Sequence, residues 1–259
     1  MQQIKYIECY ASIRKWTGKD PKAVWRIENR WRKTMQKSQK IFNLLQEKKL
    51  IGLLTPKNVE QCLIAYETLN PLGIVLEIAF RSEAASDGIK AVLNKYPDAL
   101  ILAGTVMTEK QAEMAIQTGV AGIVSADYIS EVVEVCVKND VMCIPGGLGD
   151  CGKQLVQKAM LYNCELNEVK EKYPYQWIYK LFPAATETGS NIGLVKAWKG
   201  PFKGLIVVYT GGISFKNLNE VVQMDPDGIF CGSAVTKAID MPEKMKEEAQ
   251  RWLEIIHKH

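Results

Sequence analysis

The stretch that decides the fold is 50-LIGLLTPKN-58. It opens with an apolar run of strand length, residues 50–55, and ends in a proline-containing turn. A doubly wound nucleotide-binding sheet carries a Gly-x-Gly-x-x-Gly turn after its first strand, because the glycines let a phosphate approach the backbone. No such turn follows here. The stretch therefore favours another arrangement of strands and helices.

Apolar runs of strand length recur along the rest of the chain. Seven follow the first, at residues 74–80, 99–104, 121–126, 141–146, 177–182, 205–210 and 227–232. Segments with helical apolar spacing lie between or after them, at 83–96, 108–118, 130–138, 150–162, 214–222 and 241–257. Eight strands that alternate with helices are typical of a (β/α)₈ barrel, with a doubly wound open sheet as the rival. We predict an α/β fold, a (β/α)₈ TIM barrel with an N-terminal helical extension.

The N-terminal segment, residues 1–49, differs from the rest in charge and pattern. Its apolar residues recur every three or four positions, at Val24, Ile27, Trp31, Met35, Phe42 and Leu45. Residues 1–40 hold 11 Lys and Arg against 3 Asp and Glu, a net charge of +8, whereas the whole chain carries +4. We predict a basic amphipathic helical extension over 1–49 and a (β/α)₈ barrel domain over 50–259. The helix either packs on the barrel or contacts a partner subunit or nucleic acid; no recognition motif supports nucleic acid.

Composition excludes several classes of protein. The chain is 47% hydrophobic and 24% charged, which is ordinary for a globular protein. It has no apolar run long enough to span a membrane and no secretory signal. Its 7 cysteines form no Cys-x-x-Cys pair, which favours a reduced, cytoplasmic protein over a disulfide framework or zinc site. The 2 histidines, His257 and His259, stand at the C-terminus, so we expect no metal and no cofactor.

One lysine interrupts a strand that otherwise reads as buried. Lys180 lies within 177-WIYKLFPA-184, where desolvating an ammonium group costs several kcal/mol. Active sites of barrels gather at the carboxyl ends of the strands, where Glu77 and Arg81 are also expected. If Glu77 and Lys180 both point inward, the lysine amine can attack a ketone to form a Schiff base, with the carboxylate moving protons. The alternative is a structural ion pair of Glu77 with Lys180 or Arg81.

Glycine-rich turns follow the last two predicted strands. They are Thr210-Gly211-Gly212 and Gly232-Ser233. Glycines let backbone N–H groups approach an anion, and the loops after strands seven and eight form the common phosphate site of barrels. We predict a phosphate or other anion at these turns; the alternative is that the glycines only make tight turns.

Together these motifs resemble a known family. The stretches that carry the resemblance are LEIAFRS (76–82), AGTVMTEKQAEMAIQTGVAGIVS (103–125), YKLFPA (179–184), GPFKGLIVVYTGGIS (200–214) and CGSA (231–234). Over residues 40–240 the chain resembles the class I aldolases that act on 2-keto-3-deoxy-6-phosphogluconate and 4-hydroxy-2-oxoglutarate. The resemblance implies a (β/α)₈ enzyme that cleaves a 2-keto-3-deoxy sugar phosphate or a 4-hydroxy-2-oxo acid to pyruvate and an aldehyde. It also implies a homotrimer that needs no metal.

The resemblance assigns roles residue by residue. It implies that Lys180 forms the Schiff base and that Glu77 is the general acid and base. It implies that Arg81, Thr105 and Thr210 bind the substrate. Phosphate would be bound by Gly211, Gly212, Gly232 and Ser233.

The chain departs from the family pattern at several places, of which two bear most on the site. Ser125-Ala126-Asp127 stands where the family has Ser-Pro-Gly, which puts a carboxylate where the keto-acid end is expected. Residues 163–176 lengthen the connection before Lys180 by roughly 15 residues. These departures keep two alternatives open: a non-catalytic barrel that binds a sugar phosphate, and a Schiff-base dehydratase or decarboxylase.

Overall fold

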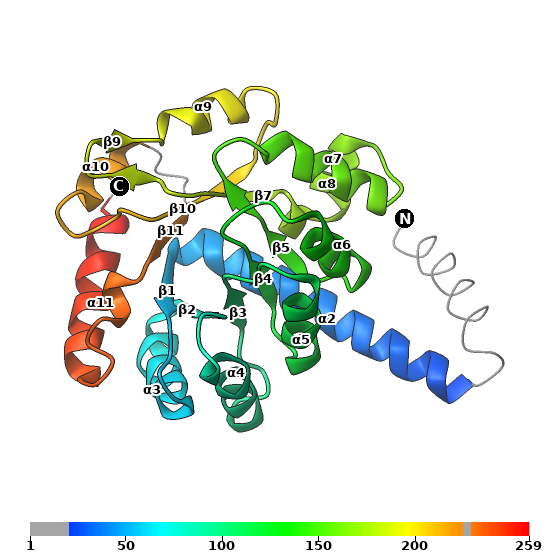
Figure 1. Cartoon of the computed structure of the whole chain (residues 1–259), viewed down its shortest axis with the longest axis horizontal. Coiled ribbons are helices and arrows are strands. Elements are labelled where there is room, and N and C mark those ends of the chain that lie inside the picture. The colour runs from blue at the N-terminus through cyan, green and yellow to red at the C-terminus, as the bar shows by residue number, and fades with distance from the viewer. Residues whose placement is uncertain (1–20, 225–228, 259) are drawn as a thin grey trace.

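The strands form one closed parallel barrel (Figure 1). The structure is a computed structural model that describes residues 21–224 and 229–258, with side chains described for 33–224 and 232–258. The sheet runs in the order β5-β4-β3-β2-β1-β11-β10-β7-β6. Its two ends meet, because only Pro145 separates β5 from β6. The barrel strands are β1 (Leu50–Leu54), β2 (Val75–Ala79), β3 (Ile101–Gly104), β4 (Gly122–Val124), β5 (Met142–Ile144), β6 (Gly146–Gly147), β7 (Ile178–Leu181), β10 (Ile206–Thr210) and β11 (Ile229–Gly232).

Helices surround the strands and bury their outer faces (Figure 1). They are α3 (Val59–Leu69), α4 (Ala84–Lys95), α5 (Glu109–Thr118), α6 (Ser130–Lys138), α7 (Cys151–Leu161), α9 (Gly193–Lys199), α10 (Leu218–Met224) and α11 (Pro242–Ile256). Short 3₁₀ helices η1 (Asn70–Leu72) and η3 (Ala234–Thr236) follow α3 and β11. The barrel predicted from the eight apolar runs is confirmed, with β5 and β6 together forming the fifth run. The predicted strand 227–232 is described from Ile229 onward.

A long helix, α2 (Pro21–Lys48), crosses the N-terminal end of the barrel. Ile41, Phe42 and Leu45 on its second half are buried. The buried Ser38 hydroxyl donates to the Ala121 carbonyl oxygen (3.1 Å) and accepts from the Met142 N–H (3.0 Å), so it joins the helix to the starts of β4 and β5. In Figure 1 this helix passes behind the strands. The boundary at residue 49 stays a prediction, and residues 1–20 lie outside the described residues.

Residues 163–176, which we predict to lengthen the connection before β7, are folded. They contain α8 (Leu166–Lys172), which begins with a capping box of Glu165 and Glu168, and η2 (Pro174–Gln176). The Tyr162 and Tyr173 rings stack with their centroids 3.7 Å apart. The segment therefore packs against the end of α7 instead of forming an open loop. A short antiparallel hairpin of β8 (Ala185–Thr186) and β9 (Gly189–Ser190) follows β7 and is exposed except at Ala185.

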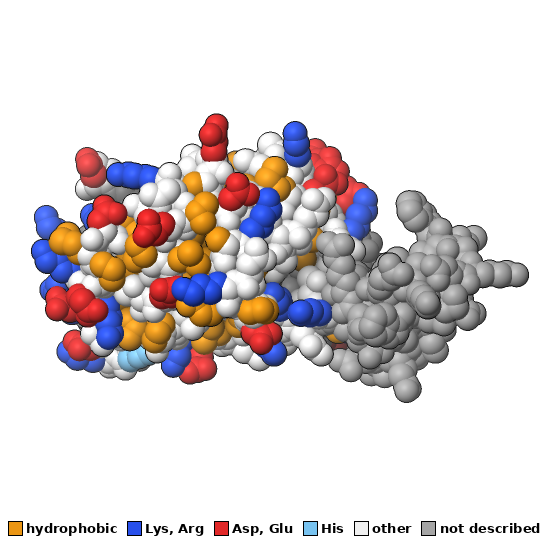
Figure 2. All heavy atoms as spheres, turned by 90° about the horizontal axis from the view of Figure 1, so that it is seen from below, with side chains coloured by type: hydrophobic (Ala, Val, Ile, Leu, Met, Phe, Trp, Pro, Cys, Tyr) orange, Lys and Arg blue, Asp and Glu red, His pale blue; other side chains and the backbone are white. Residues whose placement is uncertain are grey.

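The described surface carries charges of both signs. On the face seen in Figure 2, Lys and Arg side chains are interspersed with Asp, Glu and apolar side chains. That face offers no single-signed patch in its described part, which is what a nucleic-acid footprint would require. No helix in residues 21–224 and 229–258 combines the length and apolar character needed to cross a bilayer.

Candidate active site

Lys180 projects into the barrel interior. Its neighbour Tyr179 faces the helices, because its ring meets the Trp198 ring of α9 edge-on at 5.2 Å. Successive side chains of a strand point to opposite faces, so Lys180 points inward. The side chain is only 4% exposed. Its ammonium nitrogen lies 5.3 Å from the centroid of the Phe182 ring.

A glycine on the adjacent strand makes room for the lysine. Gly146 of β6 pairs with Lys180 in the parallel register. A Cβ atom built on Gly146 would stand 2.8 Å from Lys180 Cε and equally close to the Ser125 and Ala126 carbonyl oxygens. Real Cβ contacts of this length are essentially absent. Gly146 therefore sets the space that the lysine stem occupies, and sequence reasoning did not single it out.

Glu77 projects into the same interior from β2. The parallel registers align Glu77 with Leu102, and Leu102 with Gly122 and then Met142. Cys143, the next residue on β5, hydrogen-bonds Cys136 of α6 and thus faces outward. Met142 and the residues aligned with it therefore face inward. Glu77 is 1% exposed, so both the carboxyl group and the Lys180 amine lie in the barrel core.

A second glycine accommodates the glutamate. A Cβ atom on Gly104, at the end of β3, would stand 2.1 Å from Glu77 Oε1. No side chain can occupy that position while Glu77 keeps its place. Like Gly146, Gly104 was not predicted as a site residue, although it ends the apolar run that precedes Thr105.

Arg81 and Thr105 meet at the rim of the barrel. The Arg81 Nε donates to Thr105 Oγ1 over 3.0 Å, joining the ends of β2 and β3. Arg81 is exposed and Thr105 half-buried. Thr105 has φ +53, a left-handed conformation that a β-branched residue rarely adopts. The pair predicted to bind one end of the substrate is thus brought together by two neighbouring strands.

Thr210 ends β10 on the inner face. Val208 is in register with Lys180, and Thr210, two residues on, shares its orientation. The Thr210 hydroxyl is buried and has no hydrogen-bond partner among the described residues. A buried hydroxyl without a partner costs about 1–3 kcal/mol, which a bound ligand would recover.

The two glycine turns lie side by side on the rim. β10 pairs with β11 so that Thr210 is opposite Cys231, which brings Gly211 and Gly212 to the same end as Ser233. Gly211 and Gly212 have φ +87 and +70, so both need the left-handed freedom of glycine.

Gly232 has a packing explanation of its own. A Cβ atom there would stand 3.2 Å from the Trp252 ring of α11, so its bare side faces the helix layer. Ser233 is exposed and precedes η3. Of the four predicted anion-binding residues, Gly211, Gly212 and Ser233 thus lie at the open rim, whereas the Gly232 Cα faces α11.

Asp127 lies at the rim between β4 and β6. Its carboxylate is exposed and accepts a hydrogen bond from the Tyr128 N–H over 2.8 Å. A Cβ atom on Gly147 would stand 3.0 Å from Asp127 Oδ1. The carboxylate is therefore held by its own loop beside the strand that adjoins Lys180.

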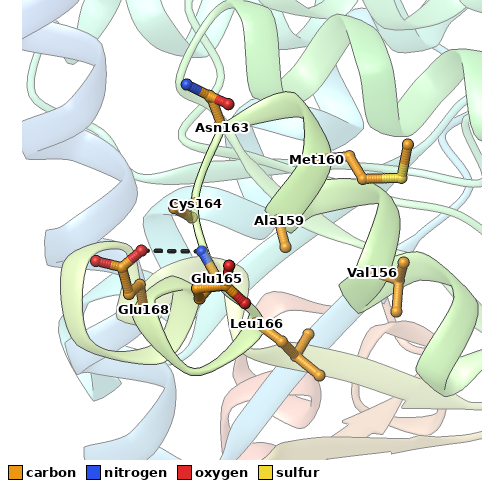
Figure 3. A pocket seen from close by; sticks show the side chains of 8 residues that line it. All are labelled: Val156, Ala159, Met160, Asn163, Cys164, Glu165, Leu166 and Glu168. Atoms are coloured by element: carbon orange, nitrogen blue, oxygen red, sulfur yellow. Dashed lines mark hydrogen bonds between the residues drawn. The ribbon is translucent and has the colours of Figure 1, made fainter.

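Within residues 33–224 and 232–258, no group of three His, Cys, Asp or Glu side chains is placed to hold a metal. A hollow of about 450 Å³ lies between α7 and α8 (Figure 3), and none of the predicted site residues lines it. It is lined by Val156, Ala159, Met160, Asn163, Cys164, Glu165, Leu166 and Glu168.

A closed parallel barrel with an inward lysine and an inward carboxyl group is the arrangement of a (β/α)₈ enzyme that can form a Schiff base. Comparison with known families agrees: the chain matches the family described as KDPG and KHG aldolase over residues 41–250. It belongs to that family.

Individual relatives are similar over most of their length. The 2-dehydro-3-deoxy-phosphogluconate aldolase of Haemophilus influenzae is 29% identical over 219 residues, which cover 84% of this chain and 92% of the relative. The KHG/KDPG aldolase of Escherichia coli K12 is 25% identical over 177 residues, 68% of this chain and 75% of the relative.

A solved structure is similar in both fold and sequence. The KDPG aldolase of Legionella pneumophila, with pyruvate captured as a covalent carbinolamine, has a TM-score of 0.66 and 26% identity. The likeness covers 83% of this chain and 97% of that one. The predictions of the family, of the barrel and of a class I carbon–carbon lyase are confirmed.

Proposed function

We propose that this chain cleaves a 2-keto-3-deoxy sugar phosphate or a 4-hydroxy-2-oxo acid to pyruvate and an aldehyde, with Lys180 as the nucleophile. The observation that carries the proposal is the buried, inward-facing Lys180 in a core that also holds the inward carboxyl group of Glu77. A lysine in such a core has a functional explanation as an amine nucleophile.

The reaction follows from these two groups. The neutral Lys180 amine attacks the C2 ketone, and loss of water from the carbinolamine leaves an iminium ion. The iminium accepts the electron pair of the C3–C4 bond as the C4 hydroxyl loses its proton, which releases the aldehyde and leaves an enamine. Protonation at C3 and hydrolysis then release pyruvate and the free amine. Glu77 carries the protons, and the iminium supplies the electron sink, so we expect no metal or cofactor.

The rim residues suit the two ends of such a substrate. Arg81, held by Thr105, supplies a cation for the keto-acid carboxylate. The unpartnered Thr210 hydroxyl supplies a hydrogen bond inside the barrel. The turns at Gly211, Gly212, Gly232 and Ser233 would bind the phosphate, with Gly232 contributing backbone only.

We also infer a homotrimer and a cytoplasmic role in carbohydrate metabolism. Large exposed apolar side chains on the described surface support an interface between subunits; they include Leu148, Val156 and Met160. The thiols of Cys62, Cys136, Cys143 and Cys151, which form no disulfide, support a reducing compartment. Light scattering with the full chain would test the trimer.

Borohydride trapping tests the proposed chemistry. The full chain is incubated with pyruvate and sodium borohydride, and the modified residue is located by mass spectrometry. We expect a reduced pyruvyl adduct on Lys180, none in Lys180→Met, and a normal adduct in Lys196→Met, whose lysine is exposed on α9. Absence of the wild-type adduct would overturn the proposal. Release of carbon dioxide or water without an aldehyde fragment would point instead to a decarboxylase or dehydratase.

A further inference from the structure

Strand β7, which carries Lys180, lies beside β5 and β6. Along β5, side chains supply the hydrogen bonds that main-chain groups supply along β6. Above Pro145, main-chain bonds join β6 to β7: the Lys180 N–H donates to the Pro145 carbonyl (2.9 Å) and the Phe182 N–H to the Gly147 carbonyl (3.4 Å). Pro145 itself has no N–H, so it cannot donate a main-chain hydrogen bond to β7. We call the contact between β5 and the start of β7, residues 141–145 and 176–178, the seam.

Gln176 takes the place of a strand residue at the bottom of the seam. Its side-chain oxygen accepts from the Cys143 N–H (3.1 Å), and its side-chain nitrogen donates to the Val141 carbonyl (2.9 Å). A residue paired with Met142 in a parallel ladder would use the same two groups. The buried amide of Gln176 therefore imitates a peptide unit of the missing strand.

Lys158 fills the next position. Its ammonium nitrogen, on α7, donates to the Cys143 carbonyl and to the Gln176 main-chain carbonyl, both over 2.9 Å. One donor thus bridges β5 and the residue that leads into β7. The side chain is completely buried, so neither carbonyl has water as an alternative partner.

The segment inserted before β7 holds these groups in place. The Gln176 side-chain nitrogen also lies 3.1 Å from the Tyr162 hydroxyl, which in turn donates to Asp140 Oδ1 over 2.8 Å. Tyr175 donates to the same Asp140 oxygen over 2.7 Å. The network therefore ties the insertion to Asp140, two residues before the start of β5.

We propose that Lys158 and Gln176 are positioning residues that fix the register of β7 relative to β5 and β6. They thereby fix the position of the Lys180 amine. This rests on the proposed function of Lys180. The first main-chain rung above the seam is made by Lys180 itself, through the Pro145 carbonyl. A shift of β7 along β5 would displace the hydrogen bond from the Lys180 N–H to the Pro145 carbonyl. It would also displace the lysine side chain that Gly146 confines.

We expect such a shift of β7 to lower the reaction rate more than it lowers the stability of the fold. Misplacement of a reacting group by about 1 Å costs on the order of 100-fold in rate. Removing the buried ammonium also removes its desolvation cost, which offsets part of the cost of leaving two buried carbonyls without a donor. Lys158→Met should therefore lower the rate at which Lys180 forms its imine, out of proportion to any loss of folding.

The test compares Lys158→Met with wild type in the full chain, well below both melting temperatures. The first readout is the rate constant of borohydride-trapped imine formation with pyruvate, which we expect to fall roughly 10- to 100-fold. The second is amide hydrogen exchange over residues 178–181, which we expect to become faster. Gln176→Glu keeps the acceptor for the Cys143 N–H but removes the donor to Val141, and should act in the same direction. If Lys158→Met does not fold, the same two measurements on Gln176→Glu test the proposal.

Ser38→Ala is the matched control. Ser38 is as buried as Lys158 and also hydrogen-bonds the base of β5, but its partners are Ala121, Asp140 and Met142, none of which lies in β7. It should lower the melting temperature and leave the trapping rate unchanged. Unchanged trapping and unchanged exchange in the seam variants would overturn the inference. If wild type itself forms no adduct, the proposed function fails, and the exchange measurement alone still decides whether the seam holds β7.

Discussion

The Cα of Gly146 lies so close to the Lys180 side chain that a Cβ atom on the glycine would stand 2.8 Å from the lysine Cε. The Ser125 and Ala126 carbonyl oxygens close the other sides of the same space. The position of the nucleophile is therefore defined by its neighbours as much as by its own strand.

Gly146→Ala should displace the lysine. Because two of the crowding atoms belong to the backbone, the lysine stem must yield, and we expect kcat to fall roughly 10- to 100-fold. Pyruvate release from the substrate measures it. Gly189→Ala is the control, since nothing lies within 4 Å of a Cβ there. Equal activity of both variants would contradict the expectation.

Glu77→Gln should abolish most turnover while leaving the fold intact. The substitution keeps the shape of a buried side chain but removes the group that accepts and returns protons, a contribution of roughly 100- to 10,000-fold. Steady-state kinetics and circular dichroism give the two readouts. A variant with nearly normal kcat would show that another group carries the protons.

Thr105→Ala should weaken substrate binding more than it slows turnover. Arg81 loses the hydroxyl that accepts from its Nε, so the guanidinium is less well oriented for a carboxylate. We expect KM to rise roughly 10-fold, about 1.4 kcal/mol, with little change in kcat. Thr105→Ser retains the hydroxyl and should behave like wild type. A loss confined to kcat would place the pair in the chemical step instead.

Asp127→Asn should improve the binding of an anionic substrate. Its carboxylate lies at the rim beside Gly147, where it repels negative charge approaching Lys180. We expect KM to fall a few-fold at low ionic strength and the difference to shrink as salt screens the charge. Asp87→Asn on α4 makes the same change in net charge at an exposed site and serves as the control. A KM that rises would mean that Asp127 orders the rim.

The buried Lys158 should make stability depend on pH. Burial lowers the pKa of its ammonium group to about 8, from an unfolded value near 10.4. Between those values the unfolded chain holds a proton that the folded chain has released, so the free energy of unfolding rises with pH relative to Lys158→Met. Below pH 8 the difference is constant. The full change is about 3 kcal/mol. Urea unfolding of both proteins across this window measures it, and parallel curves would contradict it.

Local pattern was sufficient for the strands and for part of the site. The apolar runs placed all eight barrel strands, and the helices α4 to α7 and α11 lie within a residue or two of their predicted ranges. The helix α10 begins at Leu218, later than predicted, because residues 211–217 form a turn in which Asn217 bonds Gly212 and Ser214. The helix α3 was not predicted, since its buried face includes the polar Gln61, which bonds Asp240.

The sequence by itself determined which side chains can point inward, because the alternation of a strand has a period of two and is a local property. Lys180, Glu77 and Thr210 were found in this way or through the family motif. Only the tertiary structure decided what lies beside them. The glycines that make room, the rim position of Asp127 and the Lys158–Gln176 seam depend on lateral register. Register is set by the hydrogen-bond pairing between neighbouring strands when the sheet closes into a barrel. The sequence of a single strand does not specify that pairing.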